Sequence, residues 1–320
     1  EFFLPSKYTD LATDSQRIIF FDGPSQLFQV HGEVFTYFPS SEIRNLTVFY
    51  WGNNNKYNVE YDYHFHTNNF GLVQATDVLP HRDTFLVVGD SFTEGQGAEP
   101  WFDHVSPEIA KLGYQAVNGG LMGTGFVQWD KLQHYLAAQN FQIRKVLVVF
   151  ISDDYRRPIA HLTPGVFQCL STPSLCQVGE SYFYRLPPPN SLDSWINKIR
   201  TARAATIKKS WLAGHAETLL PATYHIYWYF KNKYYGQRYR DPAEVARGDQ
   251  AGQQSHVAIA ELIGKYGRSN VAFLHLPQKD EIGGDPTDLG LKARHSIEES
   301  GGRLFDGFTL CGLTPQDYYR

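Results

Sequence analysis

Three consecutive residues, Gly89-Asp90-Ser91, have types and a setting that suit nucleophilic chemistry. They directly follow an uncharged apolar run at 85–88, which is typical of a strand buried on both faces. Ser91 is therefore expected at the carboxyl end of a strand, where open parallel α/β sheets bind ligands and where a following helix directs its N–H groups. A serine hydroxyl in this position is a candidate nucleophile; the alternative is that Ser91 only caps the helix.

Two later segments repeat this pattern, with glycine or polar residues directly after a predicted strand. Residues 118–123, Asn-Gly-Gly-Leu-Met-Gly, follow one short strand, and Ser152-Asp153-Asp154 follow a strongly apolar one. Because the carboxyl ends of parallel strands meet at one edge of a sheet, we expect the three segments to lie together. Gly123 would let a backbone N–H approach a substrate closely, or would only permit a turn with positive φ.

Strands and helices alternate from about His81 onward. Such alternation indicates parallel, right-handed βαβ units. Residues 81–320 are therefore predicted to form an α/β domain, a flavodoxin-like three-layer αβα sandwich with a parallel five-stranded sheet. The expected strands lie at 85–89, 115–117, 145–151, 270–276 and 303–306, and the expected helices at 101–112, 126–139, 251–267 and 287–300.

Two regions lie outside the minimal sandwich. Residues 1–80 contain alternating aromatic and β-branched runs separated by turn clusters, which predicts a small β-rich N-terminal module. Residues 155–255 form an insertion whose first part is loop-like and whose helical part, near 194–236, is rich in Trp and Tyr. This helical part acts as a lid or substrate platform, or its aromatic side chains pack on the sheet.

Metal or cofactor chemistry has little support in the sequence. His64 and His66 would share a face of a strand and are the best candidate metal ligands. No third ligand has a matching spacing, so ordinary packed or solvated histidines are favoured, and no cofactor is expected.

The composition and the cysteines indicate which partners and which cellular location to expect. With 42% hydrophobic residues, 19% charged residues and a net charge of -4, the chain is globular and has no basic run that would bind nucleic acid. No apolar run is long enough to span a membrane. Cys169 and Cys176 are spaced for a small disulfide, which would favour an exported protein. Because the chain starts at Glu1, we expect either a longer precursor from which a signal peptide or N-terminal membrane anchor has been removed, or a start at Glu1-Phe2 that was left by cloning.

Taken together, Gly89-Asp90-Ser91, residues 118–123 and Ser152-Asp153-Asp154 resemble the first three sequence blocks of the SGNH (GDSL-type) hydrolase superfamily. The resemblance covers residues 84–154 well and does not include residues 1–80. It implies that Ser91 is the nucleophile. It also implies that the backbone N–H groups of Ser91 and Gly123 hold the oxyanion that forms during acyl transfer.

The third block departs from the Gly-x-Asn-Asp pattern of this superfamily, because Asp153 stands where an asparagine would donate to the oxyanion. An ionised carboxylate would repel that charge. Either Asp153 is held protonated and donates, or another group donates, or activity is reduced. Arg156 and Arg157 lie close enough in sequence to neutralise Asp153, and Asp154 is a further candidate catalytic residue.

The base of the superfamily comes from an Asp-x-x-His near the C-terminus, which this sequence lacks, since Asp317 is followed three positions later by Arg320. We expect the catalytic Asp and His to lie beyond Arg320 in the native protein. The alternative base is His275, near the end of the strand predicted at 270–276. A serine without a base is a poor nucleophile at neutral pH.

The resemblance thus implies a serine-dependent carboxylester hydrolase or O-acetyl/acyl transferase. An exported protein, periplasmic or secreted and either free or anchored in the membrane through an absent segment, would act on an ester of an envelope or extracellular glycan or lipid. Fold and triad do not specify the substrate. The alternative is a catalytically weak, SGNH-like carbohydrate-binding or assembly protein, which the aspartate at 153 and the absent Asp-x-x-His favour.

Overall fold

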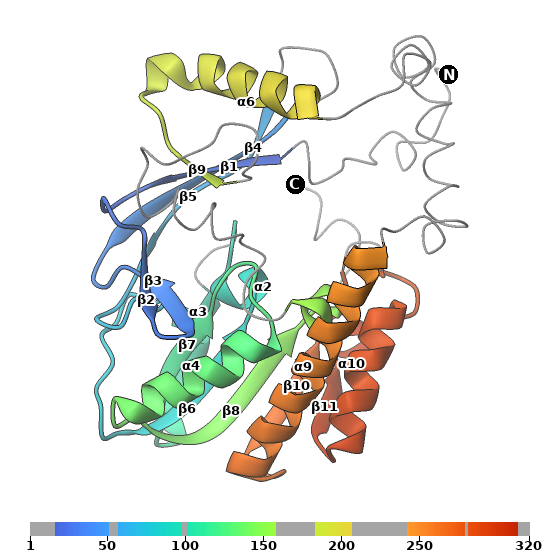
Figure 1. Cartoon of the computed structure of the whole chain (residues 1–320). Coiled ribbons are helices and arrows are strands. Elements are labelled where there is room, and N and C mark those ends of the chain that lie inside the picture. The colour runs from blue at the N-terminus through green and yellow to red at the C-terminus, as the bar shows by residue number, and fades with distance from the viewer. Residues whose placement is uncertain are drawn as a thin grey trace.

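The computed structural model describes residues 17–50, 57–97, 101–157, 183–206, 242–278 and 281–312. Its centre is a five-stranded sheet (Figure 1) in which all neighbouring strands are parallel. The order of the strands across the sheet is β11-β10-β8-β6-β7. These strands are β6 (Asp83–Gly89), β7 (Gln115–Gly120), β8 (Gln142–Phe150), β10 (Val271–His275) and β11 (Arg303–Asp306).

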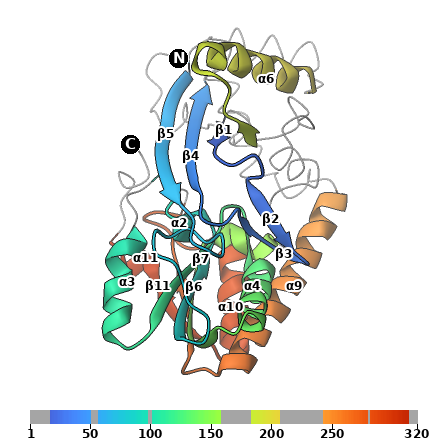
Figure 2. The same ribbon diagram turned by 90° about the vertical axis from the view of Figure 1, so that its left-hand side faces the viewer.

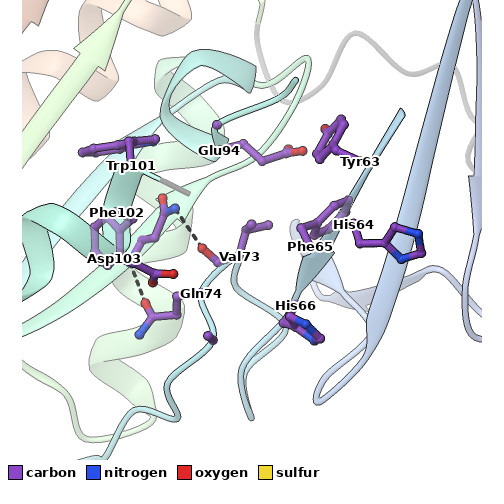
Figure 3. A pocket seen from close by; sticks show the side chains of 13 residues that line it. Tyr63, His64, Phe65, His66, Val73, Gln74, Glu94, Trp101, Phe102 and Asp103 are labelled. Atoms are coloured by element: carbon purple, nitrogen blue, oxygen red, sulfur yellow. Dashed lines mark hydrogen bonds between the residues drawn. The ribbon is translucent and has the colours of Figure 1, made fainter. Parts of the chain in front are cut away.

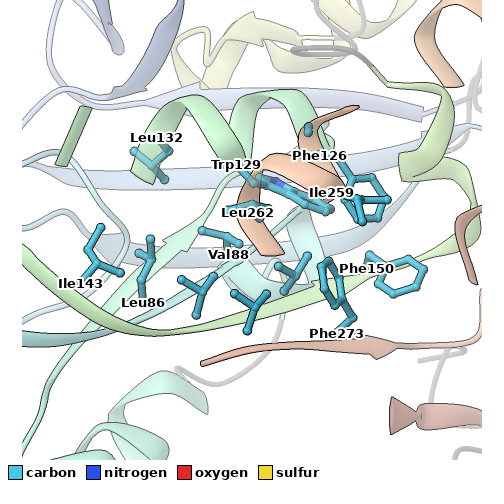
Figure 4. Packing of buried hydrophobic residues seen from close by; sticks show 14 of the residues in the cluster. Leu86, Val88, Phe126, Trp129, Leu132, Ile143, Phe150, Ile259, Leu262 and Phe273 are labelled. Carbon is cyan, nitrogen blue, oxygen red and sulfur yellow. The ribbon is translucent and has the colours of Figure 1, made fainter. Parts of the chain in front are cut away.

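Helices cover both faces of this sheet. Helices α4 (Phe126–Ala138), α9 (Pro242–Tyr266) and α10 (Asp288–Glu299) pack on one face, and α3 (Trp101–Lys111) packs on the other. Because side chains alternate along a strand, Val88 of β6 joins the first core, which Figure 4 shows, while Val87 joins the second. The predicted flavodoxin-like three-layer sandwich is confirmed.

The order of the strands identifies one special place in the sheet. The chain enters at β6, adds β7 on one side and then β8 on the other, so the direction of winding reverses between β6 and β8. Such a switch point leaves a crevice at the carboxyl ends of the two strands, where ligands of open α/β sheets bind. Ser91 follows the first of these strands, and Ser152-Asp153-Asp154 follow the second.

A second, four-stranded sheet lies beside the sandwich (Figure 2), in the order β5-β4-β1-β9. Three of its strands, β1 (Arg17–Asp22), β4 (Glu42–Tyr50) and β5 (Tyr57–His66), come from the predicted N-terminal module. The hairpin of β2 (Phe28–His31) and β3 (Val34–Tyr37) belongs to the same region. The fourth strand, β9 (Phe183–Arg185), comes from the insertion and pairs in parallel with β1.

The insertion also supplies a helix to this second sheet. In α6 (Leu192–Thr206), Ile196 and Ile199 are buried against Ile18 and Phe20 of β1. The described part of the aromatic segment therefore packs on the N-terminal sheet, and the β-rich module draws on the insertion as well as on residues 1–80. The remainder of that segment and the pair Cys169 and Cys176 lie outside the described residues.

The predicted elements of the sandwich agree closely with the observed ones, and the differences are local. Helix α9 begins at Pro242, several residues before the expected start at 251, so its first turns belong to the predicted insertion. No helix in the part of the chain that the structure describes is both long enough and apolar enough to cross a bilayer.

Candidate active site

The geometry around Ser91 is set by the end of β6. A Cβ atom on Gly89 would lie 2.4 Å from the carbonyl oxygen of Val149 and 1.9 Å from Thr93 Oγ1, so only glycine fits there. The carboxylate of Asp90 accepts a hydrogen bond from the N–H of Phe92 at 2.9 Å and caps the helix that follows. Asp90 therefore performs the capping role that the sequence left open for Ser91.

This helix, α2 (Ser91–Glu94), is a single turn of four residues, and it ends at Gly95, whose φ is 89°. The helix expected directly after the strand is therefore present, but it is short. One turn contributes little dipole, because the macrodipole is a sum over aligned peptide units. Stabilisation of negative charge at this site must therefore come from individual N–H groups.

The three sequence blocks lie side by side. Gly89 stands opposite Gly120 of β7 and opposite Val149 of β8, so the three strands end at the same level. The segment after β7, residues 121–125, is called the oxyanion loop below. Its Leu121 N–H donates to Gly89 O at 3.0 Å, and Gly123 has a φ of 71°, which favours glycine.

Two backbone donors in this cluster are unused. Within the described residues, the N–H groups of Ser91 and Gly123 donate to no protein acceptor. Three neighbouring N–H groups are occupied: Phe92 N–H by Asp90, Met122 N–H by Glu94 and Thr124 N–H by the carbonyl of Leu121. Free donors at the ends of neighbouring strands are what stabilisation of an oxyanion requires.

A buried charge cluster joins the first and third blocks. Arg157 Nη1 lies 2.8 Å from Asp154 Oδ1 and 3.3 Å from Asp90 Oδ2. Burial raises the pKa of both carboxyls, and that of Asp154 rises further because Asp90 is near. The second oxygen of Asp154 accepts from the N–H of Ile151 at 2.9 Å. Both oxygens of Asp154 therefore stabilise the third block, so the role of this residue is structural.

The oxyanion loop also touches this third block directly. A Cβ atom on Gly125 would lie 2.1 Å from the carbonyl oxygen of Arg157 and 2.7 Å from that of Asp154. Backbone therefore contacts backbone between the end of the loop and the 3-10 turn η2 (Ser152–Arg156).

Asp153, in the third block, has a cationic partner. Asp153 Oδ2 accepts from Arg156 Nη2 at 2.9 Å, and 30% of the Asp153 side chain is exposed. The N–H of Asp153 donates to Gln278 Oε1 at 2.6 Å. Of the two arginines that the sequence offered, Arg156 pairs with Asp153 and Arg157 does not. The Asp153 side chain therefore already accepts a hydrogen bond from a guanidinium group.

His275, the alternative base, uses both of its ring nitrogens in contacts with residues other than Ser91. It is buried and stacks on Phe150 with ring centroids 4.5 Å apart. Arg294 Nε donates to its Nδ1 at 2.8 Å, so the ring proton is assigned to Nε2, which lies 3.1 Å from Ser152 Oγ. Ser152 in turn donates to Glu281 Oε1 at 2.5 Å. With both ring nitrogens occupied, His275 has none free to accept a proton from Ser91.

A pocket of about 90 Å³ lies beside α2, between β5 and the start of α3 (Figure 3). Its walls include Tyr63 and Phe65 on one side and Trp101 and Phe102 on the other. Glu94 lines the pocket, whereas Ser91 does not, so the pocket is a neighbour of the proposed nucleophile.

The two histidines that were candidate metal ligands also line this pocket. His64 and His66 are exposed, and His64 Nδ1 lies 3.3 Å from Glu42 Oε1. Among the described residues, no group of three or more His, Cys, Asp or Glu side chains is arranged to hold a metal ion.

Comparison of the chain with protein-family models and with curated proteins finds no match. The case for a function therefore depends on the residues and their geometry. Two residues that the sequence reading did not assign, Glu94 and Glu281, are buried in this region. The sequence signal for Glu94 was its place three residues after Ser91, on the same helical turn.

Proposed function

We propose that the protein is a serine-dependent carboxylester hydrolase or O-acetyl/acyl transferase of the SGNH type, with Ser91 as the nucleophile. The observation that carries the proposal is the pair of unused N–H groups, on Ser91 and Gly123, at the carboxyl ends of adjacent strands. Acyl transfer develops negative charge on a carbonyl oxygen, and each preorganised donor to that oxygen contributes about 3 kcal/mol.

In this mechanism Ser91 Oγ attacks the acyl carbonyl, and its proton passes to a histidine. The tetrahedral oxygen receives hydrogen bonds from the N–H groups of Ser91 and Gly123. Collapse of this intermediate expels the alcohol and leaves an acyl-enzyme, which water or an acceptor hydroxyl then resolves. The base is a histidine other than His275, because both ring nitrogens of His275 are occupied.

The substrate class that we propose is an ester on an envelope or extracellular glycan or lipid, encountered by an exported protein. The pocket beside α2 supports a glycan, because the aromatic faces of Tyr63 and Trp101 suit the apolar face of a sugar ring. The chemistry requires no metal and no organic cofactor.

The test is hydrolysis of p-nitrophenyl acetate by three proteins: the native protein with any residues that follow Arg320, its Ser91→Ala variant, and the chain ending at Arg320. Turnover by the native protein alone identifies Ser91 as the nucleophile and places the base after Arg320. A native protein that is no faster than its Ser91→Ala variant contradicts the proposal.

One observation favours a second candidate function, a catalytically weak carbohydrate-binding or assembly protein. Asp153, paired with Arg156, offers a carboxylate where an amide donor would serve catalysis. A fluorophosphonate probe separates the two candidates, because it labels an activated Ser91 covalently and leaves an unactivated serine unmodified. Glycan binding by a protein that the probe does not label would favour the second candidate.

A further inference from the structure

Glu94 lies where three parts of the molecule meet. It is on the same helical turn as Ser91, and only 6% of it is exposed. Its Oε2 accepts the N–H of Met122 at 2.6 Å. Both of its oxygens lie 3.2 Å from the hydroxyl of Tyr37, a fully buried residue of β3. One side chain thus joins the turn that carries the nucleophile, the oxyanion loop and the N-terminal module.

The hydrogen bond to Met122 fixes the part of the loop that matters most for catalysis. Met122 directly precedes Gly123, whose N–H is one of the two unused donors. A Cβ atom on Gly120 would lie 2.3 Å from the N of Glu94, so the end of β7 and α2 are in backbone contact. By holding the Met122 N–H, Glu94 sets the direction of the chain that presents the next N–H.

The other side of the loop is held by the N-terminal module. The side chains of Leu121 and Met122 are buried in one hydrophobic cluster with Phe35 and Tyr37 of β3. Both the polar and the apolar contacts of the loop therefore depend on residues that precede the sandwich in sequence.

The hydrogen bonds at Glu94 do not need a charge. Burial raises the pKa of Glu94 to about 8, so the neutral acid is the main form at neutral pH. A neutral acid still accepts the Met122 N–H through its carbonyl oxygen and can donate to the oxygen of Tyr37. A glutamine has nearly the same shape as that acid and likewise offers one carbonyl acceptor and one donor group.

From these contacts we propose that Glu94 is a positioning residue of the oxyanion loop, and that through Tyr37 it makes the N-terminal module part of the catalytic unit. The proposal rests on the function proposed above. It assigns Glu94 no contact with substrate, because the residue acts through the backbone of Met122.

The test compares two substitutions that separate length from charge, in the full native protein with p-nitrophenyl acetate. Glu94→Gln keeps the length and the acceptor, and we expect a kcat within about 3-fold of the wild type. Glu94→Asp keeps the acid but withdraws it by one methylene from Met122. We expect it to lower kcat about 10-fold or more while KM changes little, because the loss of one preorganised donor costs about 10²–10³ in kcat. Tyr266→Phe, which removes a part-buried tyrosine hydrogen bond to Gln133 on α4, is the matched control and should leave kcat unchanged.

The proposal would be overturned if kcat were lower in Glu94→Gln than in Glu94→Asp, or if Glu94→Asp had the same kcat as the wild type. Hydrogen–deuterium exchange of the Met122 amide gives a readout that does not depend on turnover. We expect faster exchange in Glu94→Asp and wild-type exchange in Glu94→Gln. If the native protein and Ser91→Ala are equally inactive, the proposed function fails, and the exchange data alone decide whether Glu94 holds the loop. If Glu94→Asp does not fold, Tyr37→Phe replaces it, with faster exchange at Met122 expected and unchanged exchange overturning the proposal.

Discussion

At the residue scale, Asp153 stands where the proposed mechanism would use an asparagine as a hydrogen-bond donor. Its carboxylate is paired with the exposed Arg156, and its own N–H is taken by Gln278. Under the proposed mechanism, these contacts leave the oxyanion with two backbone donors and a carboxylate nearby. A reduced rate, and not a different chemistry, is what this arrangement should produce.

Replacing Asp153 by asparagine should raise the rate. The amide of Asp153→Asn removes the charge and adds a donor, so we expect kcat for p-nitrophenyl acetate to increase at least about tenfold. Asp153→Ala removes the charge without adding a donor and is the control. Equal rates for the two variants would show that position 153 does not reach the oxyanion.

The buried network at His275 makes a prediction about acid stability. Burial, with the nearby Arg294 guanidinium, lowers the pKa of His275 to about 4 from 6.5. Between pH 4 and pH 6.5 the unfolded chain binds more protons at His275 than the folded chain does. The contribution of the neutral His275 to the free energy of unfolding is therefore complete above pH 6.5 and is lost as the pH falls toward 4. Glu281 and Asp306 act in the opposite direction and raise the pKa of His275, but by less.

We therefore expect the free energy of unfolding in urea to be lower at pH 5 than at pH 7, with His275 accounting for about 2 kcal/mol of the difference. His275→Gln should lack this part of the pH dependence, whereas His295→Gln, at an exposed position, should retain it. A His275→Gln protein with the wild-type pH dependence would rule out the assigned network.

At the scale of elements, the connection between the oxyanion loop and the third block depends on Gly125. Its φ of -145° is open to any residue, so the requirement for glycine is the close approach of the Arg157 carbonyl. Gly264 offers a contrast, because it is exposed in α9 and a Cβ atom there would meet nothing within 4 Å.

The same substitution should have opposite effects at these two glycines. Gly125→Ala must push the loop away from η2, and we expect it to destabilise the protein by about 1–3 kcal/mol and to lower kcat. Gly264→Ala should stabilise the protein by about 0.5–1 kcal/mol, because alanine favours the helix. Urea unfolding and p-nitrophenyl acetate turnover, measured on both, check the pair; a stable, fully active Gly125→Ala protein would contradict the packing described.

The elements of the sandwich were predictable because their signals are local. An apolar run forms β8 and is followed by Ser152, and a second apolar run forms β6 and ends at Gly89. The apolar pattern and the residues that end it were sufficient to predict both strands. The pairing of β9 with β1 joins residues far apart in the sequence and leaves no local pattern. The contacts Tyr37–Glu94 and Arg157–Asp90 were missed for the same reason, since a charged residue read alone looks like surface.

At the scale of the whole molecule, one hydrophobic cluster joins the four-stranded sheet and the β2–β3 hairpin to the loop that follows β7 of the five-stranded sheet. Phe35 and Tyr37 of the hairpin pack with Leu121 and Met122 of the oxyanion loop, and Gln128 of α4 donates to the carbonyl of Phe35 at 2.8 Å. A core that is shared in this way should make the two sheets unfold together.

Hydrogen exchange in increasing urea tests this expectation. The amides of Val48 in β4 and Val148 in β8 should lose protection in one step. Phe20→Ala leaves a cavity beside the N-terminal sheet. We expect it to lower the free energy of unfolding, measured from the exchange of either amide, by about 3–5 kcal/mol. Loss of protection in β4 while β8 remains protected would show that the sheets are independent.

The position of β9 limits how the two sheets can be exchanged by recombination during evolution. This strand completes the N-terminal sheet but is encoded after the third sequence block, between β8 and β10. Recombination at a boundary near residue 80 would transfer a sheet without its last strand and leave β1 as an unpaired edge, which is a site of aggregation. The gene segments for the two sheets are interleaved, so neither can be exchanged alone, and both should be gained or lost together across lineages.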